Sequence, residues 1–216
     1  MKEKIAQFLW PPLRANRENR LIRTRLQQKA EVALWTSIND NVFTALKNHK
    51  NLTESSNAAA ELVESEGRRK DTIEAKASVI VQSAGIATSI IALAPAVLDK
   101  KWVLSFWWSV AVLALYIVGI VHLLTAVYYA ANARRVGTFA MPSADGLINL
   151  LKRSSENLER KLIAQKITDA KWNEDALTIK MNLLSVAEDL FLRGLAFFAA
   201  SVTIAILWTA IIHAWQ

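Results

Sequence analysis

The chain has 216 residues, of which 53% are hydrophobic and 21% charged, which is too apolar for a typical soluble domain but suits a protein that lies partly in a membrane. It contains no cysteine, which excludes disulfides and thiolate catalysis. Its formal net charge of +7 favours anionic partners.

Residues 1–77 are predicted to form cytoplasmic N-terminal helices. Met1–Trp10 fits a short amphipathic helix that Pro11 and Pro12 end. An apolar stripe at three- and four-residue steps then predicts one long helix from Leu13 to about Lys50. The stripe consists of Ile22, Leu26, Trp35, Ile38, Val42 and Leu46.

A basic cluster occupies the first half of this predicted helix. It comprises Arg14, Arg17, Arg20, Arg23, Arg25 and Lys29, against the single acid Glu18. Such a cluster can bind anionic lipid headgroups or a nucleotide, with nucleic acid the less favoured partner. The alternative is a solvated helix face that follows the positive-inside bias.

A second helix is predicted from about residue 54. Asn48–Asn51 has the composition of a turn, and Thr53 with Glu54 fits a helix cap. Gly67 is the one weak point of this helix, where the sequence permits a bend. The helix is expected to continue into the first long apolar run.

Three apolar runs are each long enough to cross a bilayer, which takes roughly 20 helical residues. They are Ser78–Leu98, Trp102–Ala130 and Leu190–Trp215. Because only Asp99, Lys100 and Lys101 separate the first two, residues 78–130 are predicted to form a transmembrane hairpin with spans 78–98 and 102–130. Residues 190–216 are predicted to form a third transmembrane helix.

Residues 131–189 are predicted to be a second cytoplasmic helical region. Gly137 and Met141-Pro142 end the preceding helix, and Ser143 with Asp145 caps a new one. A leucine-rich seam indicates nearly parallel packing against the 13–50 helix, in the same chain or in a neighbouring one. The seam comprises Leu147, Leu151, Leu158, Leu162, Leu177, Met181, Leu184 and Ala187.

Basic residues near the span ends predict the orientation. Arg68, Arg69 and Lys70 precede the first span, and Arg134 and Arg135 follow the second. The N-terminus is therefore expected in the cytoplasm and the C-terminus outside.

Each apolar run also carries small or polar residues on one helical face. These are Ser78, Gln82, Gly85 and Ser89 in the first, Tyr116 and Gly119 in the second, and Ala196, Ala200 and Thr203 in the third. Small residues allow close helix packing in lipid, and so many faces are buried most easily in a homo-oligomer. The alternative is that Gln82, Ser89 and Tyr116 line a polar path.

His122 is the one ionisable residue expected deep in a span, so it is a candidate for gating or proton relay as well as for a structural or interfacial role. The chain contains no HExxH, Walker A or GxGxxG motif, and the predicted topology separates its three histidines. We therefore expect no enzyme, no metal site and no cofactor.

The fold class is thus an all-α integral membrane protein, with a two-helix transmembrane hairpin, a third transmembrane helix and a long-helix cytoplasmic bundle. Glu74-Ala75-Lys76-Ala77 leading into the first span, the hairpin and the long helix after it resemble the SLATT and Pycsar transmembrane effectors of bacterial anti-phage defence. The resemblance covers roughly residues 68–190 and rests on architecture and this short lysine-alanine motif. A third span and the lack of a recognisable sensor domain depart from the family's pattern.

The resemblance implies an oligomer in the bacterial inner membrane that permeabilises it after a nucleotide signal or a protein partner is sensed. Its partners would then be the lipid bilayer, further copies of the chain and a cytoplasmic trigger. Two alternatives remain open. One is a non-catalytic membrane scaffold that docks a cytoplasmic partner through residues 1–50, and the other is a subunit of a channel or transporter.

Overall fold

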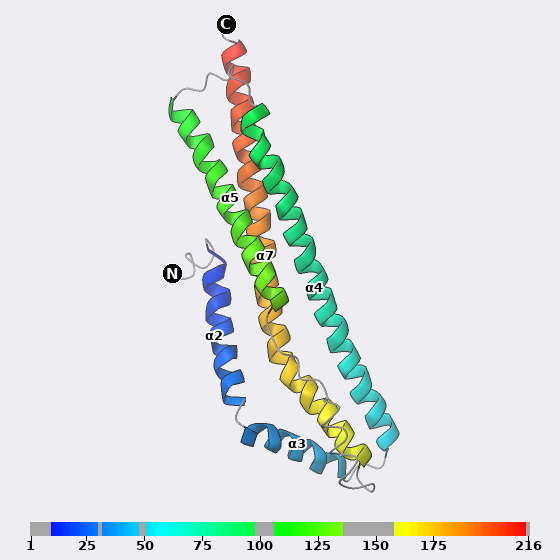
Figure 1. Cartoon of the computed structure of the whole chain (residues 1–216). Coiled ribbons are helices and arrows are strands. Elements are labelled where there is room, and N and C mark those ends of the chain that lie inside the picture. The colour runs from blue at the N-terminus through cyan, green and yellow to red at the C-terminus, as the bar shows by residue number, and fades with distance from the viewer. Residues whose placement is uncertain (1–9, 30–31, 48–50, 98–105, 136–157, 215–216) are drawn as a thin grey trace. The chain divides into compact units, whose positions relative to one another are not determined.

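A computed structural model describes residues 10–29, 32–47, 51–97, 106–135 and 158–214 of the chain. These residues form five helices and no strand (Figure 1): α2 Pro12–Lys29, α3 Val32–Lys47, α4 Leu52–Val97, α5 Phe106–Arg135 and α7 Leu158–Ala214. The predicted all-helical fold is therefore confirmed.

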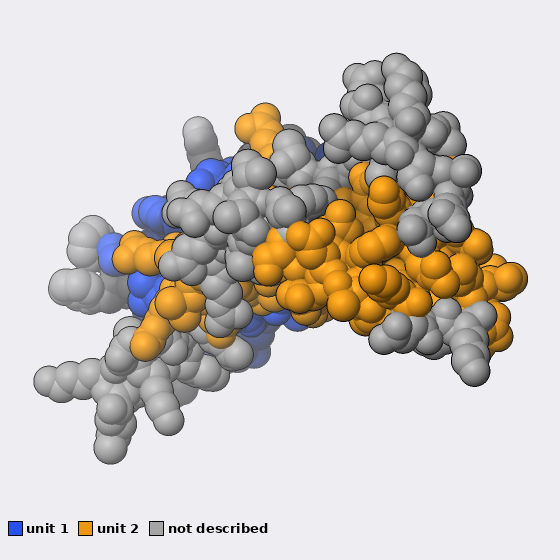
Figure 2. Space-filling model, turned by 90° about the horizontal axis from the view of Figure 1, so that it is seen from below, with its two compact units in different colours: residues 1–13, 74–134, 183–216 blue, residues 14–73, 135–182 orange. Residues whose placement is uncertain are grey.

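The chain divides into two compact units, which Figure 2 distinguishes by colour. Unit 1 comprises residues 1–13, 74–134 and 183–216, and unit 2 comprises residues 14–73 and 135–182. α4 and α7 each contribute residues to both units without a break in the helix.

Unit 2 has a small apolar core that α3, α4 and α7 share. Leu46, Ala59, Ile163 and Ala164 are buried there, and Val42, Phe43, Leu52 and Ile167 pack around them. α2 joins the same unit, where the Asn182 side-chain amide donates a hydrogen bond to the Asn19 side-chain oxygen over 3.1 Å. Val42 and Leu46 of the predicted 13–50 stripe thus pack against α7 within one chain. Their neighbours on α7 are Ile163, Ala164 and Ile167, which are not members of the predicted seam.

Two local predictions about these helices are wrong. The single helix over 13–50 is two helices, α2 and α3, although no proline or glycine marks the sequence between them. Met181, predicted in the buried seam, is 45% exposed, whereas Leu177, Leu184 and Ala187 are buried. α4 runs through Gly67 as one helix, and a bend at this residue stays a prediction.

The cap of α4 is Asn51 rather than Thr53. The Asn51 side-chain oxygen accepts the Glu54 backbone N–H over 3.4 Å, and the Asn51 amide donates to the Glu54 carboxylate over 2.9 Å. The first bond satisfies one of the backbone donors that a helix start leaves without partners, and the second joins the two side chains. The helix therefore begins at Leu52, two residues earlier than predicted.

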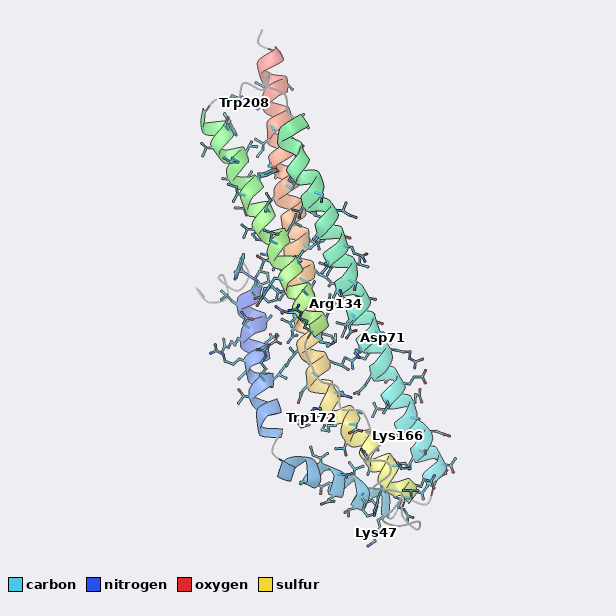
Figure 3. All side chains as sticks on the ribbon, in the orientation of Figure 1. Lys47, Asp71, Arg134, Lys166, Trp172 and Trp208 are labelled. Atoms are coloured by element: carbon cyan, nitrogen blue, oxygen red, sulfur yellow. The ribbon has the colours of Figure 1, made fainter. Side chains whose placement is uncertain are left out.

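In unit 1, α5 and α7 pack antiparallel. Trp108 contacts Trp208 with ring centroids 5.0 Å apart, and Tyr116 contacts Phe198 at 5.8 Å. As residue numbers rise along α5 they fall along α7. Trp208 and Arg134 lie toward opposite ends of this unit (Figure 3). The second and third predicted spans are therefore neighbours that run in opposite directions.

Two helices among the described residues are long and apolar enough to cross a membrane. They are α5 over Trp108–Arg135 and α7 over Leu158–Trp208. The first predicted span, Ser78–Leu98, begins within α4, and its crossing of a membrane stays a prediction. The hairpin loop, the cap at Ser143 and Asp145, and the seam residues Leu147 and Leu151 lie outside the described residues.

Candidate helix-packing site

α5 and α7 cross in unit 1 at two glycines. A Cβ atom added to Gly119 would lie 3.2 Å from the carbonyl oxygen of Gly194, and one added to Gly194 would lie 2.8 Å from Cγ of Leu123. The Gly194 Cβ would also lie 3.1 Å from the carbonyl oxygen of Gly119. The two backbones thus approach so closely that neither position accommodates a side chain without a shift of its neighbours. This is the close packing that small residues permit between membrane helices.

His122, one turn beyond Gly119 on α5, is buried in an aromatic cluster. Its ring centroid lies 5.2 Å from that of Phe197 on α7 and 5.6 Å from that of Trp10, in an edge-to-face arrangement with the latter. Its side chain is 8% exposed. Trp10 lies two residues before α2, so the chain's N-terminal region contacts α5 of its own unit.

A hydrogen bond fixes the tautomer of neutral His122. Nδ1 lies 2.8 Å from the carbonyl oxygen of Val118. Since a carbonyl can only accept, Nδ1 carries the proton and donates it, and Nε2 of the neutral ring is an acceptor. His122 therefore donates a hydrogen bond within its own helix and packs against two aromatic rings. These contacts are those of a structural residue.

The sequence-predicted residues on α5 meet at this crossing, and those on the other two helices do not. Tyr116, Gly119 and His122 all contact α7. On α4, Ser78 is half-buried, whereas Gln82, Gly85 and Ser89 are exposed. On α7, the three predicted residues, Ala196, Ala200 and Thr203, are exposed as well. The exposed faces of α4 and α7 are available to a second copy, and their role in assembly stays a prediction.

The small residues that α7 buries in unit 1 lie on a different helical face from the three predicted ones. They include Gly194, Ser201 at 2% exposure and Ala205 at 5%. The Ser201 hydroxyl donates to the Phe198 carbonyl over 2.7 Å, so its polarity is satisfied within α7. Gly194, Ser201 and Ala205 recur at steps of seven and four, a small-residue pattern that the sequence does contain.

Arg193 enters the apolar part of α7 as half of an ion pair. Its Nη2 lies 3.0 Å from Asp189 Oδ2, and its Nε donates to Asp189 Oδ1 over 3.2 Å. A bidentate pair one turn apart offsets both charges before the helix becomes fully apolar.

The basic cluster is partly described. Arg17, Arg20 and Arg23 are exposed on α2. The side chains of Arg14, Arg25 and Lys29 lie outside the described part of the structure.

Unit 2 buries charged groups that no pattern in the sequence indicated. Asp169 and Lys180 on α7 are 5% and 1% exposed, and Glu66 on α4 is 9% exposed. Burial raises the pKa of Asp169 to about 6, and Asp169 Oδ2 has no hydrogen-bond partner. Burial raises the pKa of Glu66 most, and the nearby carboxylate of Glu174 raises it further. The Arg69 guanidinium acts in the opposite direction and lowers this pKa. Ionised carboxylates are thus costly in this unit.

The described residues contain no group of three His, Cys, Asp or Glu side chains placed to hold a metal ion. Comparisons with protein-family models, curated proteins and solved structures find no match to this chain.

Proposed function

We propose that the chain is an oligomeric effector of the bacterial inner membrane. Its helical body, unit 2, senses a cytoplasmic ligand or partner, and the helices of unit 1 disturb or permeabilise the membrane in response. The observation that carries this proposal is the continuity of α4 and α7. Each is a single helix with one part in the charged body and one part in the apolar unit.

The surface of unit 1 supports its insertion in lipid. α5 exposes a stripe of large apolar side chains at three- and four-residue steps, and α7 exposes a second set. The α5 stripe comprises Leu113, Ile117, Val121, Leu124 and Tyr128, and the α7 set includes Leu192, Val202, Ile206, Leu207 and Ile211. A water-soluble protein rarely exposes so much contiguous apolar surface, whereas lipid tails solvate it.

The buried carboxylates of unit 2 support the proposal that this unit responds to a ligand, a partner or a proton. Asp169 and Glu66 are held in surroundings that disfavour their charged forms. A cationic ligand, a protein partner or a proton that neutralises them would change the stability of the helices that carry them. Because those helices are α7 and α4, the change acts on elements that also belong to unit 1.

The orientation, the inner-membrane location and the role in anti-phage defence belong to the proposal. The arginines and lysines that flank the apolar runs support an N-terminus in the cytoplasm and a C-terminus outside. The architectural resemblance to SLATT and Pycsar effectors supports the role in defence.

Permeabilisation is tested by expressing the full chain in bacterial cells and following membrane potential with a voltage-sensitive dye. We expect depolarisation that grows with expression level. The same experiment with Gly194→Leu, which damages the α5–α7 crossing, should abolish it. Purified chain in dye-loaded vesicles provides the cell-free version, and membranes that stay tight in both settings would overturn the effector function.

One observation favours a second candidate, the membrane scaffold. Aromatic rings and glycine backbones fill the α5–α7 interface, so a single copy does not line a polar path there. A scaffold would dock its partner through residues 1–50 without conductance. A stable complex captured by crosslinking through this segment, together with intact membrane potential, would favour it.

A further inference from the structure

The most basic of the five described helices is α2. It carries five arginines and one lysine against one glutamate. α3, which follows it, carries one lysine and one aspartate. Among the described helices, α2 therefore has the largest excess of positive charge, ahead of α5 with its two arginines and no acid.

The described arginines of α2 share one outward face. Arg17, Arg20 and Arg23 follow one another at three-residue steps, and all three are exposed. The opposite face is occupied within the chain, where Ala15 is 3% and Asn19 4% exposed. Asn19 also accepts the hydrogen bond from Asn182. α2 is thus fixed to unit 2 by one face and presents its arginines on the other.

Two exposed leucines lie among or beside these arginines. At about 3.6 residues per turn, Leu13 falls between Arg17 and Arg20 on the helix surface. Leu21 falls about 40° beyond Arg17, on the side away from Arg23. Leu13 is 48% exposed and Leu21 is 58% exposed. Leucines beside arginines are typical of helices at a membrane surface, where acyl chains cover the apolar groups and phosphates meet the guanidinium groups. A polyanion such as nucleic acid would leave the leucines uncovered.

The residue Trp10, just before α2, contacts α5, which is a candidate membrane helix. Trp10 contacts His122 of α5, and the Leu13 N–H donates to the Trp10 carbonyl over 3.1 Å. His122 is only six residues, about 9 Å of helix, from Tyr128, an exposed aromatic residue of the kind found at membrane interfaces. Because α2 is helical and rises about 1.5 Å per residue, Arg23 lies within about 20 Å of Trp10.

We propose that the exposed face of α2 binds the phosphate headgroups of anionic phospholipids, with Arg17, Arg20 and Arg23 as the phosphate ligands and Leu13 and Leu21 against the acyl chains. This inference rests on the membrane location proposed above. It assigns the basic cluster to the lipid surface rather than to a soluble nucleotide.

Each cation near an anionic membrane surface contributes about fivefold to binding, so three arginines together contribute up to about a hundredfold. The contact also weakens with added salt, because headgroup phosphates are screened within about 10 Å at moderate ionic strength.

The test uses the full chain purified in mild detergent and the short-chain lipid dioctanoyl phosphatidylglycerol, with dioctanoyl phosphatidylcholine as the neutral lipid. The triple variant Arg17→Gln, Arg20→Gln, Arg23→Gln should lose at least tenfold in affinity for phosphatidylglycerol. A triple lysine variant at the same positions keeps the charge and should stay within about threefold of the unsubstituted chain.

The matched control removes the same charge elsewhere, with Lys47→Gln, Arg68→Gln and Lys171→Gln, three exposed cations of α3, α4 and α7. It should change the affinity less than twofold. Equal losses in the two glutamine variants would overturn the assignment to α2. Circular dichroism of each variant checks that helix content is unchanged, so that a loss reports on binding.

Two further outcomes separate the possible failures. If the unsubstituted chain is washed from reconstituted vesicles by alkaline carbonate, the membrane location itself fails. If the chain stays inserted but phosphatidylglycerol binds no better than phosphatidylcholine, only the lipid site fails. Displacement of phosphatidylglycerol by an equimolar single-stranded oligonucleotide would also overturn the proposal, in favour of a nucleic-acid surface.

Discussion

The two units differ in which side chains they bury and which they expose, although α4 and α7 contribute to both. Unit 1 exposes large apolar side chains such as Val121 at 46% and buries glycine at its helix crossing. Unit 2 buries carboxylates and a lysine, and its α2 face is basic and exposed. The difference teaches that α4 and α7 expose large apolar side chains in unit 1 and charged side chains in unit 2. This is the change along a helix that the proposed membrane location requires.

The largest effect should come from placing a charge on the apolar surface of unit 1. Val121→Arg puts a guanidinium in the middle of α5, which costs about 3 kcal/mol of insertion free energy at the centre of a bilayer. Val63→Arg is the matched control, because Val63 is 41% exposed on α4 in unit 2. It should change stability by no more than about 0.5 kcal/mol. For both variants, the measurement is the fraction of the chain that stays in the membrane after alkaline extraction. Equal losses would contradict the assignment of the apolar surface of unit 1, and not of unit 2, to lipid.

The next effect should come from the glycine crossing. Gly194→Leu drives a side chain into Leu123 and the Gly119 carbonyl, and we expect a loss of about 2–3 kcal/mol in the free energy of unfolding in detergent. Gly85→Leu is the control, since a Cβ at Gly85 meets nothing within 4 Å. Denaturant titration followed by tryptophan fluorescence compares the two.

Gly85→Leu also tests assembly through the exposed face of α4. We expect this variant to keep the stability of the single chain while its oligomers dissociate, as seen by size-exclusion chromatography with light scattering. An unchanged oligomer would refute assembly through Gly85.

The smallest effect should come from the buried carboxyl of unit 2. The pKa of Asp169 is about 6 in the folded chain and 3.8 without burial, so its contribution to stability is greatest below pH 4 and is lost as pH rises through 6. Asp169→Asn should therefore stabilise the chain at pH 8 by about 1–2 kcal/mol, less than the full shift implies because relaxation lowers the cost. At pH 4 the variant and the parent should unfold alike.

Asp71→Asn provides the comparison for this titration, because Asp71 is exposed on α4. Its unfolding free energy should match that of the parent within about 0.5 kcal/mol at both pH values. A pH-independent gain from Asp169→Asn would rule out charge burial as its cause.

Helical periodicity and the long apolar runs were sufficient to predict the all-α fold and the two candidate spans in α5 and α7. The break between α2 and α3 was not predictable, because no proline or glycine lies there and the apolar stripe continues across it. The preference for Asn51 over Thr53 as the α4 cap depended on which side chain reached the Glu54 N–H. Local sequence allowed either choice.

The site was harder to predict than the fold. Gly119 and Tyr116 were identified from their helical face, but Gly194 was not, since choosing among the small residues of α7 requires the rotation of α7 about its axis. Trp10 meets His122 across more than a hundred residues of sequence. The burial of Asp169 likewise depends on tertiary neighbours, and no spacing pattern along α7 reveals it.

The glycine crossing also constrains how this sequence can diverge. Neither Gly119 nor Gly194 has a side chain left to shorten, so a larger residue at one position cannot be compensated by a smaller one at the other. In distant relatives both positions should stay glycine together, while Gly67 and Gly85, with open space around them, should vary freely. This pairing, 75 residues apart, is a signature by which such relatives could be recognised.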